Sequence, residues 1–253
     1  MGSNSLAVVT GAASGVGAAT TARLRSRGID VIGVDISLIN DIPTSETDGN
    51  LTWVIGDISQ DETWDSVIDK SRELGVAPSI LVLAAAQLSV GNIEVTSDED
   101  WDRVFSVNVF GAIKGMKSCL PGMVEAGKGS IVTVASIDAF MVEQNFIAYC
   151  ASKGALLQIT RCVALDYARH GIKANCVCPG VIDTPFFRKH LARSENPEEV
   201  LSYRKDRNPL GRLLSADEVA EVVEFAALSN AAAITGSSLV VDGGLSLGFE
   251  FHS

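Results

Sequence analysis

Two residue types that could move a proton stand together in the middle of the chain. Tyr149 and Lys153 are four residues apart, and Ser136 precedes Tyr149 by thirteen residues. Residues four apart share one face of a helix, so the phenol and the ammonium can converge. A free tyrosine, with a pKa of about 10, is a poor base at neutral pH, and a nearby cation lowers that pKa. The pattern therefore predicts a tyrosine that exchanges a proton with an oxygen bound by the Ser136 hydroxyl.

A glycine-rich turn near the start of the chain could bind the phosphates of a nucleotide. The segment Thr10–Gly17 reads TGAASGVG and lies between an apolar segment and a predicted helix. Glycines let the backbone approach a pyrophosphate, and a helix N-terminus offers free N–H groups and a positive dipole end. Asp35 follows Gly17 by eighteen residues, at the end of the next predicted strand, where a carboxylate accepts hydrogen bonds from the adenosine ribose. The alternative is an ordinary strand-to-helix turn with an acidic residue at position 35 by coincidence, which explains the position of the acid at the strand end less well.

The residues around Asp35 predict which dinucleotide binds. Its carboxylate would repel a 2′-phosphate, and the flanking Ala13 and Ile36 are not basic. We therefore expect NAD(H) rather than NADP(H). A metal site is not expected, because the chain has three histidines and five cysteines without a CxxC pair.

Short apolar segments alternate with amphipathic ones along the whole chain. Continuous apolar strands separated by helices indicate a parallel sheet covered on both faces, and right-handed crossovers make it doubly wound. We expect an α/β fold with a Rossmann-type sheet of about seven strands, in a single domain over residues 1–253, with a surface loop at 41–50. The predicted strands are 6–10, 29–34, 51–55, 79–83, 130–135, 172–177 and 238–241. The predicted helices are 15–27, 60–74, 98–126 (with a possible break near 108–111), 149–169 and 215–229.

The segment 185–209 interrupts this pattern and predicts a lid. It contains Phe186, Phe187 and Leu191, which could cover an apolar substrate, and a dense mixture of charges suited to a solvated outer face. Asn196-Pro197 is typical of a helix start. We expect two short helices that close over the substrate; the alternative is a fixed surface excursion. The charged residues are Arg188, Lys189, Arg193, Glu195, Glu198 and Glu199.

Composition excludes several classes of protein. The chain has 253 residues, 47% of them hydrophobic, and a net charge of −11, which argues for a globular fold and against nucleic acid or an anionic membrane as the main partner. No apolar run approaches the length of a membrane span. The N-terminus lacks the basic and apolar regions of a secretory signal, so we expect a cytoplasmic protein with reduced thiols.

Taken together, the motifs resemble the short-chain dehydrogenase/reductase family, in its single-domain branch, over residues 5 to 248. The Ser, Tyr and Lys of the family are matched by Ser136, Tyr149 and Lys153. Further matches are TGxxxGxG at 10–17, V-N-x-x-G at 107–111, the Pro-Gly segment 179–184 and the closing T-G-x-x-x-x-V-D-G-G at 235–244.

The resemblance implies a role for each matched residue. Lys153 would lower the pKa of Tyr149 and hold the nicotinamide ribose, Ser136 would orient the substrate oxygen, and Asn108 would help to place a water that relays protons. Ile182 and Thr184 would hold the carboxamide. The implied catalytic residues are Asn108, Ser136, Tyr149 and Lys153, and the implied cofactor contacts are Gly11, Ser14, Gly15, Val16, Gly17, Asp35, Ile36, Asp57, Ile58, Ala84, Tyr149, Lys153, Ile182 and Thr184.

One segment departs from the family pattern. Members carry Asn-Asn-Ala-Gly after the fourth strand, whereas this chain has Leu83-Ala84-Ala85-Ala86. Backbone contacts to the cofactor survive such a change, but the side-chain bracing of the sheet does not. We therefore expect altered stability or cofactor affinity, with the catalytic residues untouched.

The resulting hypothesis is an NAD(H)-dependent oxidoreductase that interconverts a secondary alcohol and its ketone, with Tyr149 as general acid and base. The alternatives are an inactive cofactor-sensing or scaffold protein of the same fold and an NADPH-dependent acyl-carrier reductase. A cyclic alcohol, a steroid-like ring, an aromatic diol and a polyol all fit the expected pocket. Its substrate contacts are expected from Ser136, Asp138, Gln144, Tyr149 and Phe186, with Gln87, Leu88, Ile137, Phe140, Phe146 and Phe187 nearby.

Assembly is the last expectation. The helices at 98–126 and 149–169 carry apolar residues on more than one face, for example Leu156, Ile159, Val163 and Leu165. Family members pack these helices against a two-fold mate, so we expect a homotetramer, with a dimer as second choice.

Overall fold

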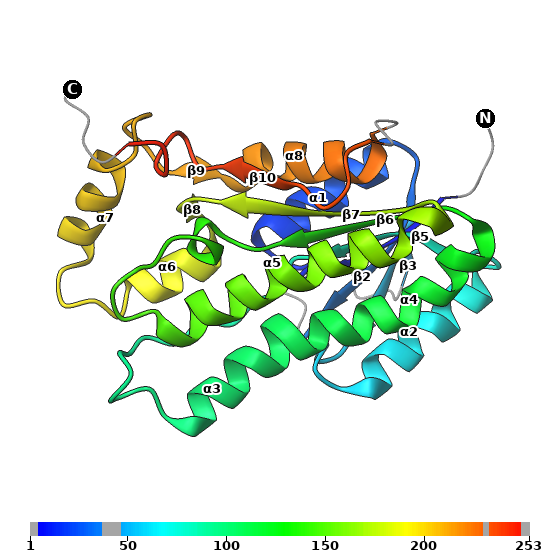
Figure 1. Ribbon diagram of the computed structural model, residues 1–253, viewed down its shortest axis with the longest axis horizontal. Helices are drawn as coiled ribbons and strands as arrows, with labels where there is room; N and C mark the ends of the chain where they lie inside the picture. Colours follow the sequence, from blue (N-terminus) through cyan, green and yellow to red (C-terminus); the bar gives the residue numbers. More distant parts are fainter. Residues whose placement is uncertain (1–4, 37–46, 230–232, 249–253) are drawn as a thin grey trace.

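An eight-stranded sheet forms the centre of the computed structural model, which describes residues 5–36, 47–229 and 233–248 (Figure 1). The strand order is β10-β7-β6-β5-β1-β2-β4-β3. Seven strands run parallel, which confirms the expected Rossmann-type sheet, and β3 pairs antiparallel with β4. The strands are β1 (Leu6–Thr10), β2 (Asp30–Asp35), β3 (Thr47–Asp48), β4 (Leu51–Ile55), β5 (Pro78–Leu83), β6 (Gly129–Val134), β7 (Ile172–Pro179) and β10 (Ser238–Val241).

Helices cover both faces of the sheet (Figure 1). On one face, α1 (Gly15–Ser26) packs against α8 (Ala216–Leu228), and on the other lie α2 (Asp61–Glu73), α4 (Ala112–Ala126) and α5 (Ile147–Tyr167). The central strands are apolar along their length because both faces are buried, and each face has its own hydrophobic cluster. Within the described part of the chain, no helix combines the length and the apolar composition that a membrane crossing needs.

The break expected in the long helical region is a π-helical turn, Ser106–Gly111, between α3 (Asp98–Phe105) and α4. Such turns are rare and occur frequently at functional sites. Helix α5 begins two residues earlier than expected, at Ile147. Of the expected loop at 41–50, residues 41–46 lie outside the described residues, and Thr47–Asp48 form β3 rather than loop.

Two short helices occupy the insertion, α6 (Pro185–Leu191) and α7 (Pro197–Asp206). A second, two-stranded sheet holds the two ends of this segment together, because β8 (Ile182–Asp183) pairs in parallel with β9 (Leu214–Ser215). The Leu214 N–H also donates to the Val181 carbonyl at 3.1 Å. Strands of two residues show no periodicity, so the sequence analysis missed this pair.

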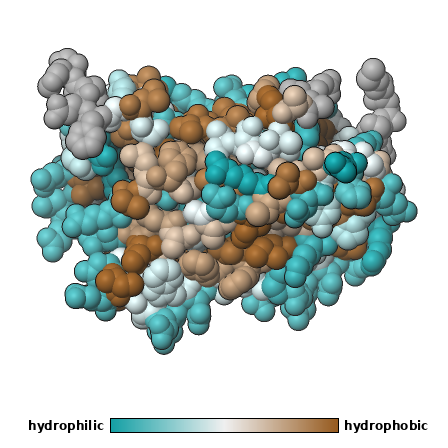
Figure 2. Space-filling model, viewed as in Figure 1, coloured by the Kyte–Doolittle hydropathy of each residue, from teal (hydrophilic) through white to brown (hydrophobic). Residues whose placement is uncertain are grey.

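Apolar side chains gather across the middle of the face that α4 and α5 form, with hydrophilic side chains around them (Figure 2). Of the apolar α5 residues expected to need a partner, Leu156 is buried, and Ile159 and Val163 pack against the core of this chain. Leu165 is 82% exposed, and Phe110 of the π-helical turn is 54% exposed. The unpartnered apolar surface is therefore smaller than the sequence indicated, and the homotetramer stays a prediction.

The segment after β5 is braced despite its departure from the family pattern. The buried Thr10 hydroxyl accepts hydrogen bonds from the N–H groups of Ala84 and Ala85, at 3.0 and 3.1 Å. The oxygen and the NH₂ group of the Asn108 side chain both form hydrogen bonds with the Gln87 backbone as well. Bracing therefore comes from neighbouring elements rather than from the segment's own side chains.

Replacing Thr10 with Val should destabilise the protein by about 1–2 kcal/mol, because two backbone N–H groups lose their acceptor. Urea unfolding measures the change. Thr20→Val is the matched control: the Thr20 hydroxyl is equally buried but has no hydrogen-bond partner within the described residues, so its removal should be neutral or stabilising. Equal losses in the two variants would contradict the bracing role of Thr10.

Candidate active site

A cavity of about 790 Å³ opens at the carboxyl edge of the sheet. Its wall comes from the turn after β1, the ends of β2 and β4, the segments after β5, β6 and β7, and helices α5, α6 and α7. Carboxyl ends of parallel strands meet at this edge, which is where open α/β sheets bind ligands. With the exceptions of Asn108 and Phe140, every site residue expected from the sequence lines this cavity.

The glycine turn fills one end of the cavity and fits a pyrophosphate. A Cβ on Gly17 would lie 2.1 Å from the Gly11 carbonyl oxygen, so this position excludes any side chain. Gly11 and Gly15 have positive φ angles of 68° and 53°, which glycine adopts without strain. The Ser14 side chain does not cap α1, so the first N–H groups of the helix remain available to an anion.

Asp35 closes the nucleotide end of the cavity. Its two carboxylate oxygens accept from the N–H groups of Ile36 at 2.8 Å and Ala13 at 3.0 Å, which fixes the carboxylate at the end of β2. Each oxygen keeps a free lone pair for a ribose hydroxyl. No lysine or arginine occurs in the sequence from 34 to 46, and none of the described residues that line this end is basic. Asp57, whose carboxylate accepts from the Ser59 N–H at 2.8 Å, and the buried Ile58 complete this end.

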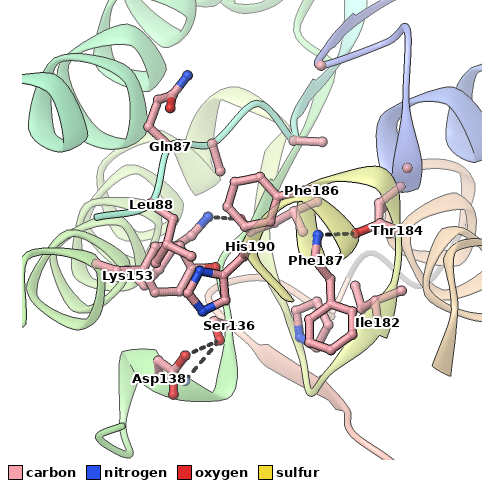
Figure 3. Close-up of a pocket in the computed structure, with 18 of the residues that line it drawn as sticks. Gln87, Leu88, Ser136, Asp138, Lys153, Ile182, Thr184, Phe186, Phe187 and His190 are labelled. Atoms are coloured by element: carbon pink, nitrogen blue, oxygen red, sulfur yellow. Dashed lines mark hydrogen bonds between the residues drawn. The ribbon is translucent and has the colours of Figure 1, made fainter. Parts of the chain in front are cut away.

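Ser136, Tyr149 and Lys153 converge at the middle of the cavity. Ser136 follows β6, and the other two stand one turn apart at the start of α5. The Lys153 ammonium lies 5.5 Å from the centre of the Tyr149 ring and donates to the Val134 carbonyl at 2.8 Å (Figure 3). Lys153 is only 2% exposed, and this burial lowers its pKa to about 8.

The pKa of Tyr149 differs from the sequence-based expectation. A lowered value was expected from the neighbouring ammonium, but burial raises the pKa above its ordinary value of 10. The negative charge of Asp138 raises it further, while the hydrogen bond that Ser136 would donate to the phenolate acts in the opposite direction. In the chain by itself, desolvation of the phenolate thus outweighs the attraction of Lys153, and Tyr149 is a protonated phenol at neutral pH.

Asn108 lies outside the cavity, on the π-helical turn. Its side-chain oxygen accepts from the Gln87 N–H at 2.7 Å, and its NH₂ group donates to the Gln87 carbonyl and the Ser152 hydroxyl, both at 2.9 Å. Both amide hydrogens are therefore used within the protein, and the residue joins the segment after β5 to α5. This geometry supports a positioning role; the expected part in a water relay stays a prediction.

The substrate end of the cavity holds most of the residues expected there, including Gln87, Leu88 and Phe186 (Figure 3). Gln144 lines it as well. Thr184 lines it too, and its hydroxyl oxygen caps α6 by accepting from the Phe187 N–H at 3.3 Å. Phe140 is the exception: it is 48% exposed and lines a separate surface pocket. It follows the short η2 helix (Ile137–Ala139), whose turn directs it away from the cavity.

Four residues of α6 and α7 and the residue that follows α7 also line the cavity and were not expected there. Arg204 is 17% exposed and pairs with Glu143, with Nη1 and Oε2 2.9 Å apart. The His190 ring contacts Phe146 edge-on, with centroids 5.3 Å apart, and burial lowers its pKa. Lys189 was expected on the solvated face of the insertion. The density of cations in this segment was the one sequence feature that could have indicated cationic residues in the cavity. The five are Lys189, His190, Tyr203, Arg204 and Arg207.

In the portion of the chain that the structure describes, no group of three His, Cys, Asp or Glu side chains could hold a metal ion.

Comparisons with known proteins show what the chain is similar to. A family model described as enoyl-(acyl carrier protein) reductase matches residues 11–246. The chain is 35% identical to 2-(R)-hydroxypropyl-CoM dehydrogenase of Xanthobacter autotrophicus, over 94% of this chain and 97% of that protein. It is 33% identical to cis-4-hydroxycyclohexanecarboxylate dehydrogenase of Sinomonas cyclohexanicum, over 94% and 95%. The ligand-free structure of Thermoplasma acidophilum aldohexose dehydrogenase superposes with a TM-score of 0.88 at 32% identity, covering 99% of this chain and 97% of the other.

The lowered pKa of Lys153 makes stability depend on pH. Between pH 8 and 10 the unfolded chain binds a proton on Lys153 that the folded protein releases, so folding is favoured as pH rises. Relative to Lys153→Met, wild-type protein should gain about 2 kcal/mol over this range. Urea unfolding at several pH values measures the difference. The exposed Lys128→Met is the control and should show a constant difference; a constant difference for Lys153→Met too would contradict its burial as an ammonium.

Proposed function

Since the chain belongs to the short-chain dehydrogenase/reductase family of oxidoreductases, we propose that it interconverts a secondary alcohol and its ketone with NAD(H). One observation carries this proposal: Ser136, Tyr149 and Lys153 stand in the same cavity as a glycine turn and Asp35. A proton-exchanging group and a dinucleotide site that share one cavity are what hydride transfer to or from a carbinol carbon requires.

Tyr149 exchanges the proton in this mechanism. When bound, NAD(H) supplies the hydride chemistry. The protonated phenol of Tyr149 donates to the developing alkoxide in reduction, and in oxidation its phenolate, after loss of the phenol proton, takes the hydroxyl proton. The Lys153 ammonium, fixed by the Val134 carbonyl, favours the phenolate as it forms and would hold the nicotinamide ribose. Ser136 orients the substrate oxygen, and Thr184 with Ile182 would hold the carboxamide.

The substrate end suits a cyclic secondary alcohol. Phe186, Phe187 and Leu88 offer apolar surface, and Gln87 and Gln144 offer polar groups. The relative that acts, by its name, on cis-4-hydroxycyclohexanecarboxylate supports this choice. The aldohexose dehydrogenase neighbour supports a polyol as a second possibility. Helices α6 and α7 would close over either substrate and exclude water.

An acyl-carrier reductase is the second candidate, because the matching family model carries that description. The net charge of −11 argues against it, since an acidic carrier protein needs a basic docking surface. Assays of NAD with secondary alcohols and of NADPH with enoyl or ketoacyl thioesters discriminate between the two. A cofactor-binding protein without turnover would be inactive in both assays.

Tyr149→Phe should reduce kcat by about 100-fold or more, because it removes the hydroxyl that exchanges the proton. NAD affinity, measured by calorimetry, should change little because the glycine turn and Asp35 remain. Tyr167→Phe, on the same helix but away from the cavity, is the control and should keep wild-type kcat. Near-normal turnover of Tyr149→Phe would remove this residue from the mechanism.

NAD should be preferred over NADP by at least about tenfold in kcat/KM, because the Asp35 carboxylate repels a 2′-phosphate and no described base lies beside it. Asp35→Ala should narrow this ratio. Asp30→Ala, at the opposite end of β2, should leave it unchanged. Equal use of both cofactors by the wild type would show that the assignment of NAD is wrong.

A further inference from the structure

The catalytic serine is hydrogen-bonded to an acid within the substrate end of the cavity. The Ser136 hydroxyl donates to Asp138 Oδ2 at 3.1 Å and accepts from the Asp138 N–H at 3.1 Å (Figure 3). A serine hydroxyl has one hydrogen and two lone pairs. With the hydrogen and one lone pair used by Asp138, Ser136 has a single acceptor position left for a ligand.

This arrangement distinguishes an alcohol from a ketone. Tyr149 is protonated, so its phenol donates to the substrate oxygen in either case. An alcohol can in addition donate its own hydroxyl hydrogen to the free lone pair of Ser136. A ketone has no hydrogen to donate, and it gains a bond from Ser136 only if the serine hydrogen turns away from Asp138.

We propose that Asp138 is a positioning residue that holds the Ser136 hydrogen and thereby makes the site bind the alcohol in preference to the ketone. The inference rests on the proposed function, since it concerns the two substrates of that reaction. Protonation of Asp138 reverses the effect, because a carboxylic acid can donate to Ser136 and release the serine hydrogen to the ketone.

The surroundings of Asp138 raise the pKa of its carboxyl group. Burial and the negative charge of Glu143 raise its pKa, while the Ser136 hydroxyl and the cations Arg204 and Lys153 lower it, and the pKa remains above its ordinary value. The titratable and charged groups around it come from the loop before α5 and from α5, α6 and α7: Glu143, Tyr149, Cys150, Lys153, His190 and Arg204.

Two variants test the hydrogen bond through binding of the two substrates. Asp138→Ala removes the acceptor and should lower KM for the ketone relative to KM for the alcohol by about fivefold, the size of one net hydrogen bond. Asp138→Asn keeps only a weaker, neutral acceptor oxygen and can turn its NH₂ group toward Ser136 instead, so it should lower the same ratio by a smaller factor. In the wild type, the ratio of KM for the ketone to KM for the alcohol should rise with pH as Asp138 ionises. In Asp138→Ala the ratio should not change with pH. An unchanged ratio in both variants overturns the proposal.

Glu143→Gln is the matched control, because it removes a neighbouring charge but leaves the acceptor of Ser136 in place. Its ketone-to-alcohol KM ratio should stay at the wild-type value. A fall equal to that of Asp138→Ala would show that charge, and not the hydrogen bond, is responsible, and would overturn the proposal.

A measurement without turnover separates this inference from the proposed function. Carbon-13 NMR titration of the Asp138 carboxyl in the full chain should give a higher pKa in Ser136→Ala than in wild type, because the serine hydrogen stabilises the carboxylate. An unchanged pKa overturns the inference, whatever the activity. Absence of turnover with NAD and any alcohol, with the pKa raised as expected, would instead refute the proposed function and leave the hydrogen bond established.

Discussion

The bond between the Lys153 ammonium and the Val134 carbonyl is the contact on which the site depends. It places a charged group in the interior between α5 and β6, where burial is costly unless the charge is hydrogen-bonded. Since Tyr149 stands one turn before Lys153, and Ser136 two residues after Val134, the same contact aligns all three side chains. The wall of the cavity is thus also the packing interface of a helix with the sheet.

Much of this could be predicted from the sequence because it depends on local patterns. Continuous apolar segments predicted the parallel strands. The glycine-rich segment predicted the turn at Gly11 and Gly17, where the structure leaves no room for a side chain against the backbone. Short elements could not be predicted: β8 and β9 have two residues each, too few for a period. Arg204 and Tyr203 were missed because their place in the cavity depends on how α7 folds back over the sheet edge, which no local pattern encodes.

Electrostatics were the least predictable property. Spacing alone suggested that Lys153 would lower the pKa of Tyr149, yet both groups are desolvated, and each has its charged form disfavoured. At neutral pH Tyr149 therefore rests as a neutral phenol, whereas Lys153, with a pKa of about 8, still carries its charge. The sign of these shifts depends on depth below the surface, which follows from tertiary packing and not from the order of residues.

The pairing of β8 with β9 divides the molecule into parts that can change independently. Because the two strands bring the ends of residues 185–209 together, the chain between them is a closed loop whose entropic cost grows only slowly with length, by about 0.6 kcal/mol per doubling. Insertions and deletions there leave the register of the sheet and the glycine turn undisturbed. The substrate specificity of such a fold can therefore change through residues 185–209 alone. The glycine turn and Asp35, which would bind the nucleotide, need not change with it.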